Sequence, residues 1–214
     1  MRKKGTSIFV DGILSGVFLC IGCMVNLLTE SKLAGAFLFS LGLFAIITFR
    51  LALYTGKAGY MAVKPASYIG EVALTLAGNA AGTALGGFLL NLTRFGGELS
   101  QKAATVMAAK TADSPVSMFL LAVFCGMLMF TAVHGEKCNR EKGNIVGALF
   151  IVVLPVMVFI LCGFNHCVAD MAYFFISGCA HCGAAGLYFV LAILGNAVGC
   201  MLIPLAKKLS ENKI

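Results

Sequence analysis

The chain has 214 residues, of which 60% are hydrophobic and only 12% are charged, and its mean hydropathy is +0.95. This composition excludes an ordinary soluble domain, in which about a quarter of the residues are charged. The formal net charge of +7 is spread over short segments between apolar stretches, as in membrane-protein loops and unlike a nucleic-acid-binding surface. We therefore expect an all-α protein of the lipid bilayer that binds no nucleic acid.

Six apolar stretches are each long enough to cross about 30 Å of hydrocarbon as a helix. In chain order we expect these transmembrane helices over residues 7–28, 33–53, 67–92, 115–133, 144–163 and 183–206. A short apolar piece at 168–176 follows the fifth helix. The charged linkers at 93–114 and 134–143 are expected to be polar loops, the first with enough alanine to form a surface helix.

Lysine and arginine predict the orientation of these spans, because cytoplasmic loops carry an excess of both. If the six helices alternate in direction, one side receives most of the positive charge: Arg2, Lys3, Lys4, Lys57, Lys64, Lys137, Arg140, Lys142, Lys207, Lys208 and Lys213. The other side receives Lys32, Arg94, Lys102 and Lys110. We therefore expect both termini in the cytoplasm and a multi-pass protein of the cell's inner or plasma membrane.

The two halves of the chain share a motif. The pattern G-N-A-x-G occurs at residues 78–82, in the third expected helix, and again at 195–199, in the sixth. Its glycines, four residues apart, are typical of close helix packing. Its asparagines carry amides that need partners inside a membrane, and such residues tend to face a cavity.

The second helix of each half is also interrupted, near residues 53–56 and again near 164–167. The pieces that remain are too short to cross a membrane, and irregular backbone at that depth is tolerated only inside protein or along a cavity. An odd number of helices per repeat makes the second copy insert upside down. We therefore expect one transmembrane channel domain over residues 1–214, with inverted three-helix repeats at about 7–92 and 115–206 and a transport site between them.

Several segments resemble the formate/nitrite transporter family, which includes formate, nitrite and hydrosulfide channels. They are F-S-L-G-L at 39–43, L-Y-T-G at 53–56, H-C-V-A-D-M at 166–171 and G-N-A-V-G at 195–199. The resemblance implies an aquaporin-like protomer of six helices with the second and fifth broken. It also implies a homopentamer with one anion path in each protomer.

The same resemblance implies a set of pore residues. His166 matches the central pore histidine, Thr55 matches the loop threonine that faces it, and Asn196 matches the asparagine of the sixth helix. Lys110 lies where the family places a lysine before the fourth helix. The bulky residues before the threonine and those of the hydrophobic constrictions match Leu53, Tyr54, Phe39, Leu43 and Phe159.

Three positions depart from the family pattern. Asn165 stands where a carboxylate usually precedes the histidine, and Asp170 stands where an asparagine usually follows it by four residues. Both departures are consistent with an exchange of one carboxylate between neighbouring sites. Phe130 stands where a polar residue is usual in the fourth helix.

These residues favour a channel or transporter for small monovalent weak-acid anions. In the mechanism that the resemblance implies, a slit of Leu and Phe removes water and a proton from His166 makes the anion neutral; an imidazole titrates near neutral pH and suits this role. Two simpler interpretations stay open, a structural His166 and an Asp170 in a polar interface. A channel for ammonia or ammonium, with Asp170 recruiting the cation, is the alternative function. A membrane enzyme or redox subunit needs paired histidines or a cofactor motif, so we expect no enzyme, no cofactor and no metal site.

Overall fold

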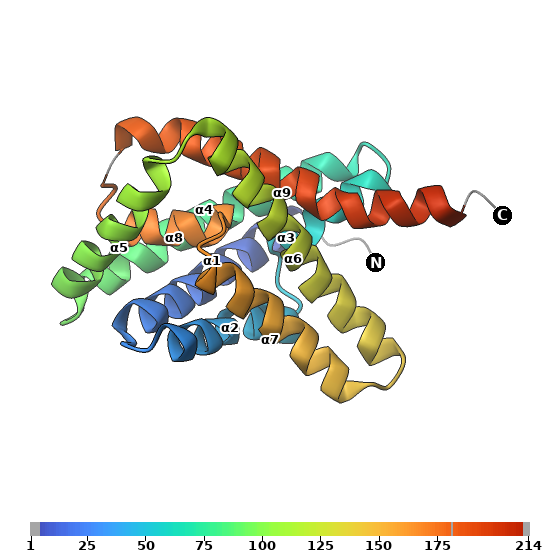
Figure 1. Ribbon diagram of the computed structural model, residues 1–214, viewed down its shortest axis with the longest axis horizontal. Helices are drawn as coiled ribbons and strands as arrows, with labels where there is room; N and C mark the ends of the chain where they lie inside the picture. Colours follow the sequence, from blue (N-terminus) through green and yellow to red (C-terminus); the bar gives the residue numbers. More distant parts are fainter. Residues whose placement is uncertain (1–4, 181, 212–214) are drawn as a thin grey trace.

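The structure, a computed structural model, describes residues 5–180 and 182–211; four cations of the orientation count, Arg2, Lys3, Lys4 and Lys213, lie outside this range. Within the described residues the chain forms α-helices, one 3-10 helix and no strand (Figure 1). The elements are α1 (Gly5–Leu28), α2 (Lys32–Thr48), α3 (Tyr54–Ala58), η1 (Gly59–Ala62), α4 (Tyr68–Asn91), α5 (Gly96–Thr111), α6 (Pro115–Glu141), α7 (Ile145–Leu161), α8 (Cys167–Ile176) and α9 (Cys182–Glu211).

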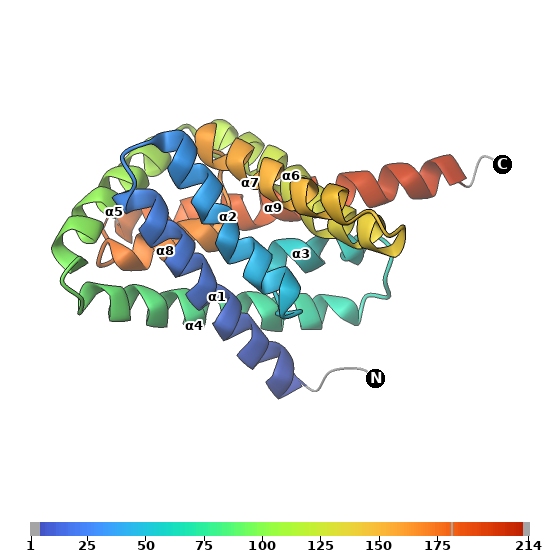
Figure 2. The same ribbon diagram turned by 90° about the horizontal axis from the view of Figure 1, so that it is seen from below.

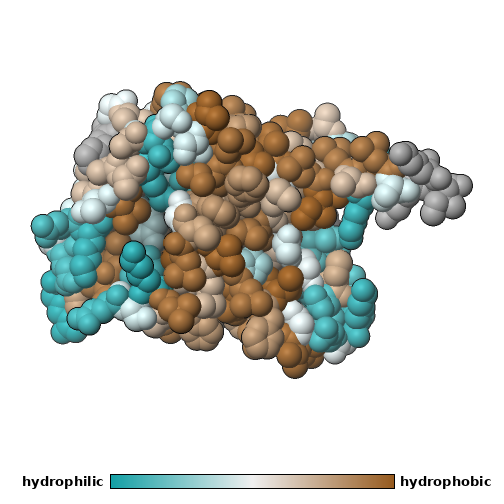
Figure 3. All heavy atoms as spheres, viewed as in Figure 1, coloured by the Kyte–Doolittle hydropathy of each residue, from teal (hydrophilic) through white to brown (hydrophobic). Residues whose placement is uncertain are grey.

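Four of these helices, α1, α4, α6 and α9, are long and apolar enough to cross a membrane. Helices α2 and α7 have 17 residues each and α8 has 10, so they are shorter than a full span. Large apolar side chains such as Phe37, Phe88 and Phe150 are more than half exposed. Figure 3 shows an apolar band between two hydrophilic ends. Lipid, rather than water, is the solvent that such a band requires, so the chain is a multi-pass membrane protein.

Two helix pairs form the closest packing: α1 lies against α4, and α6 lies against α9 (Figures 1 and 2). The motif glycines make both approaches possible. A Cβ atom at Gly82 would clash with the carbonyl oxygen of Ile13, and one at Gly199 would clash with that of Val123. The expected packing role of these glycines is therefore confirmed in both copies of the motif.

Helices α2 and α7 end in the same way. Arg50 has a φ of +54° and Gly163 a φ of +68°, the left-handed conformation that commonly follows a helix. After α2, the N–H of Leu51 donates to the carbonyl of Ile46 at 2.9 Å; after α7, Phe164 donates to Phe159 at 2.9 Å. This Schellman pattern turns the chain out of each helix, and a short linker leads to α3 or α8.

Three sequence expectations need correction. The second helix ends at Thr48 rather than at residue 53, so Leu53 lies in the linker. The loop expected at 134–143 is wrong, because α6 continues to Glu141 with i,i+4 ion pairs along its last turns. The linker at 93–114 does contain a helix, but α5 packs against α8 with its apolar side chains buried, so it is not only a surface helix.

Candidate functional site

The linker between α2 and α3 is held by an asparagine of α4. The buried Asn79 amide donates from Nδ2 to the carbonyls of Ala52 at 2.8 Å and Gly12 at 2.9 Å. Its Oδ1 accepts from the N–H of Tyr54 at 2.8 Å. One side chain therefore satisfies the backbone groups on both sides of Leu53, which no helix can satisfy there.

The linker between α7 and α8 is held in the same manner by Asn196 of α9. The amide donates from Nδ2 to the carbonyls of Ala122 at 2.7 Å and Asn165 at 2.8 Å. Its Oδ1 accepts from the N–H of Cys167 at 2.9 Å. Every polar group of this amide is used on backbone, so Asn196 positions the linker, and the expected tendency of these asparagines to face a cavity is not what the contacts show.

The first turn of α3 meets the second linker at a threonine and a histidine. Thr55 Oγ1 lies 3.0 Å from His166 Nε2, and both side chains are buried. His166 Nδ1 accepts from the N–H of Ala169 at 3.0 Å and so caps the N-terminus of α8. Because Nδ1 accepts, the neutral ring carries its proton on Nε2 and donates it toward Thr55. The buried imidazole of His166 therefore has a defined tautomer.

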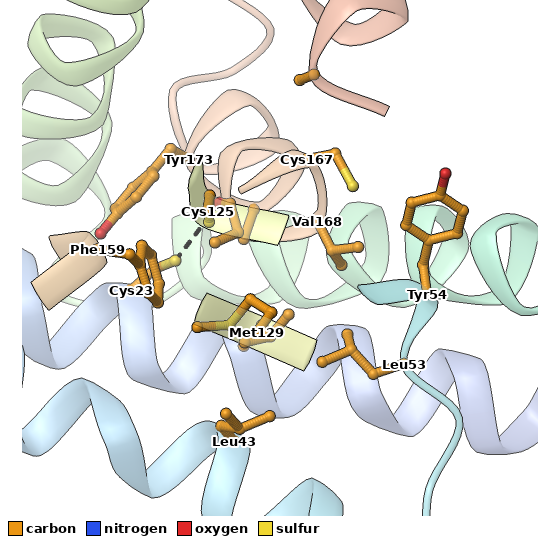
Figure 4. Packing of buried hydrophobic residues seen from close by; sticks show 14 of the residues in the cluster. Cys23, Leu43, Leu53, Tyr54, Cys125, Met129, Phe159, Cys167, Val168 and Tyr173 are labelled. Atoms are coloured by element: carbon orange, nitrogen blue, oxygen red, sulfur yellow. Dashed lines mark hydrogen bonds between the residues drawn. The ribbon is translucent and has the colours of Figure 1, made fainter. Parts of the chain in front are cut away.

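Apolar side chains surround this pair. Phe39 and Phe159 meet edge to face with ring centroids 5.5 Å apart, and Phe159 stacks on the His166 ring at 5.5 Å. Figure 4 shows Leu43, Leu53 and Phe159 among the buried side chains that gather here from separate elements. All of them are at most 3% exposed. The structure thus places Phe159 against the histidine and Phe39 against Phe159.

The hydroxyl of Tyr54 donates to the carbonyl of Ile193 at 3.0 Å, which ties α3 to α9. Phe130, the apolar residue at the departing position of α6, is buried against the rings of Tyr60 and His134. It therefore packs against η1, and none of its ring contacts is with His166.

A lysine at the end of α5 reaches the second linker. Lys110 Nζ lies 3.3 Å from Asp170 Oδ1, 3.0 Å from Asn165 Oδ1 and 3.1 Å from the carbonyl of Phe164. The hydroxyl of Tyr188, in α9, donates to Asp170 Oδ2 at 2.6 Å. The Lys110 side chain is 12% exposed and that of Asp170 is 2% exposed, so each charge is compensated by the other in a nearly dry environment.

The expected site residues therefore fall into three groups. His166, Thr55 and the apolar residues form the centre, Asn196 braces a linker, and Lys110, Asp170 and Asn165 form a polar cluster beside the linker. Tyr188 was missed, because nothing in its sequence context distinguishes a tyrosine within an apolar helix. Among the residues that the structure describes, no group of His, Cys, Asp or Glu is arranged to hold a metal ion.

A cavity of about 600 Å³ opens beside Leu53. Charged side chains from the first linker, α3 and the end of α6 line much of it: Arg50, Lys57, Glu136, Lys137, Arg140 and Glu141. Three of these cations are ion-paired: Lys57 with Glu71, Lys137 with Glu141 and Arg140 with Glu136. We refer to it below as the vestibule.

Short helices whose irregular linkers lie inside a bundle of apolar helices are typical of membrane channels and transporters, since irregular backbone is tolerated at that depth only inside protein or along a cavity. A family model described as formate/nitrite transporter matches residues 1–207. The chain belongs to the formate/nitrite transporter family, whose members are transporters and channels rather than enzymes.

Solved structures agree in fold. A pentameric formate channel with formate bound is 20% identical over 98% of both chains, with a TM-score of 0.80. An ion channel of the same family is 18% identical over 97% of this chain and 89% of its own length, with a TM-score of 0.79. The chain matches no curated protein sequence.

The asparagine contacts predict a specific loss of stability. Asn196→Ala leaves the N–H of Cys167 and the carbonyl of Asn165 without partners, and each buried group left unpaired costs about 1–3 kcal/mol. We expect a clear fall in the unfolding temperature of the protein in detergent. Asn91→Ala is the matched control, because this amide makes one bond of 3.5 Å and its Oδ1 has no partner. An equal effect of both substitutions would contradict the bracing role.

The lysine contacts predict that a carboxylate at position 165 can replace the one at position 170. Asp170→Asn leaves the Lys110 charge uncompensated, and breaking one side of a buried pair costs about 3–5 kcal/mol. Adding Asn165→Asp places a carboxylate beside the same Nζ, so the double variant should regain much of the lost unfolding temperature. A double variant that is no more stable than Asp170→Asn would show that the two sites are not equivalent.

Proposed function

We propose that the chain is a channel or transporter for small monovalent weak-acid anions, namely formate, nitrite or hydrosulfide, with His166 at the centre of the pore. The observation that carries this proposal is the contact between His166 Nε2 and Thr55 Oγ1, where two broken helices meet between apolar walls. Family membership agrees with it, and so does the formate bound to the solved relative.

The geometry supports a proton-coupled passage. The apolar walls remove water from the anion, and the N-terminal end of α8 offers a positive dipole end beside His166. The ring takes up a proton from water to become an imidazolium and then passes a proton to the anion, and the neutral acid crosses the Phe and Leu constrictions. Once the one proton of the neutral ring again lies on Nε2, Nδ1 caps α8 as before. Thr55 Oγ1 lies next to Nε2, so the anion that accepts the Nε2 proton would lie beside this hydroxyl group.

The arrangement of elements supports six spans in two inverted three-helix repeats, at about 7–92 and 115–206, within one channel domain. In this proposal α2 with α3 forms the second span and α7 with α8 the fifth. The paired contacts α1 with α4 and α6 with α9 support it, as do the two asparagine braces. Equivalent roles then fall on Leu53 and His166, the residues before α3 and α8.

We further propose a homopentamer with one anion path in each protomer, by analogy with the pentameric formate channel. The excess of positive charge on one side supports cytoplasmic termini and a location in the inner or plasma membrane. The vestibule, which lies at that positive end, would then be the cytoplasmic mouth of the pore.

A flux panel tests the function. Proteoliposomes containing the protein should take up formate, nitrite or hydrosulfide faster than empty liposomes, and should not carry ammonium. The reason is that the Asp170 carboxylate already contacts Lys110 and Tyr188, and the Lys110 ammonium group repels a second cation there. Ammonium flux above that of the anions would instead favour the alternative of an ammonia or ammonium channel.

The role of the histidine is tested separately. His166→Phe keeps an aromatic ring of similar size against Phe159 but removes the proton donor, so the flux of weak-acid anions should fall to the level of empty liposomes. The variant should retain the wild-type oligomer size in size-exclusion chromatography, which excludes misfolding as the cause. Flux at the wild-type rate would mean that His166 only caps α8.

A further inference from the structure

A second cavity lies on the other side of Tyr60 from the vestibule. Its volume is about 380 Å³, and no residue of the pore centre lines it. The lining comes from η1, α6, α9 and the chain after η1, and consists of Tyr60, Val63, Phe130, His134, Pro204, Lys207 and Lys208. We call it the rear cavity.

The lining of the rear cavity has two kinds of chemistry. Lys207 and Lys208 contribute two ammonium groups, and the described lining includes no carboxylate. Val63, Phe130 and Pro204 contribute apolar surface. A ligand that matches both kinds carries an anionic group joined to hydrocarbon.

The position of the cavity agrees with this chemistry. The two lysines lie in the last turns of α9, at the end of its apolar stretch over Gly183–Ser210. The C-terminal end of α9 lies at the same end of the molecule as the connection from α6 to α7 (Figure 1). Basic pockets between transmembrane helices at this level bind lipid headgroups.

The rear cavity and the vestibule share one lining residue. Tyr60 lines both cavities, and its hydroxyl lies 3.1 Å from His134 Nδ1. Gly59 packs so closely that a Cβ there would clash with the Phe130 ring and the carbonyl of Cys200. η1 follows α3 directly and packs tightly against α6 and α9. A ligand that shifts Tyr60 would therefore also shift α3, which carries Thr55.

We propose that the rear cavity binds the phosphate-bearing headgroup of an anionic phospholipid and that this lipid regulates the vestibule through Tyr60. The phosphate lies against Lys207 and Lys208, and the acyl chains leave along the apolar lining. The binding of the lipid does not depend on the proposed function; only the regulation of flux rests on the proposed function. Free phosphate shares the charged chemistry but lacks the hydrocarbon.

Binding is tested by native mass spectrometry of the detergent-purified protein titrated with phosphatidylglycerol, phosphatidylcholine or inorganic phosphate. Each basic side chain strengthens binding to an anionic lipid about fivefold, so Lys207→Gln with Lys208→Gln should weaken phosphatidylglycerol binding about 30-fold. The matched control, Lys32→Gln with Lys142→Gln, removes the same charge from exposed positions outside the cavity and should bind as wild type does. Equal binding by both double variants would overturn the proposal. So would binding of inorganic phosphate without phosphatidylglycerol, which would make this a free-anion site.

Regulation is tested by formate flux in liposomes with and without phosphatidylglycerol. A negative surface repels anions from every variant alike, so the informative quantity is the difference between the two lysine double variants. The control should respond to phosphatidylglycerol as wild type does, and Lys207→Gln with Lys208→Gln should lose that response. Tyr60→Phe should still bind phosphatidylglycerol but should lose the change in formate flux that the lipid causes. An unchanged flux response would overturn the proposed coupling through Tyr60. Absence of any wild-type flux would count against the proposed function, while the binding result would stand.

Discussion

Two side-chain amides make this architecture possible in a membrane. Each helix break leaves backbone N–H and carbonyl groups without helical partners, and in hydrocarbon no water replaces them. Asn79 and Asn196 supply the missing partners from neighbouring helices, each with one oxygen and two N–H bonds. The linkers can therefore lie inside the bundle, and the last residue of each, Leu53 and His166, lies between two hydrogen-bonded backbone groups.

The position of the histidine follows from this bracing. Held between two clamped backbone groups, His166 uses one ring nitrogen to cap α8 and points the other at Thr55. A cap made by an imidazole differs from one made by serine or aspartate, because it is available only while Nδ1 is unprotonated. Protonation of Nδ1 would therefore change the charge of the ring and at the same time remove the cap from the buried helix α8.

Much of this arrangement could be predicted from local patterns. The repeated G-N-A-x-G motif and the short apolar pieces indicated both linkers, because glycine spacing and helix length are properties of neighbouring residues. The length of α6 was missed, since charges after Val133 look like a loop, yet backbone hydrogen bonds and i,i+4 ion pairs continue a helix beyond the bilayer. Tyr188 was missed for another reason: its partner Asp170 is set by tertiary packing, which no spacing in the sequence reveals.

The polar cluster beside the second linker limits how the sequence can change. Lys110 and Asp170 lie against each other in a nearly water-free site, where each compensates the charge of the other, and Tyr188 and Asn165 make further hydrogen bonds to the pair. Loss of one charge leaves the other unpaired, at a cost larger than most single substitutions impose. The ammonium group touches both residue 165 and residue 170, so a carboxylate at either position keeps the charges balanced. Lys110 therefore joins positions 165 and 170 in one charge balance.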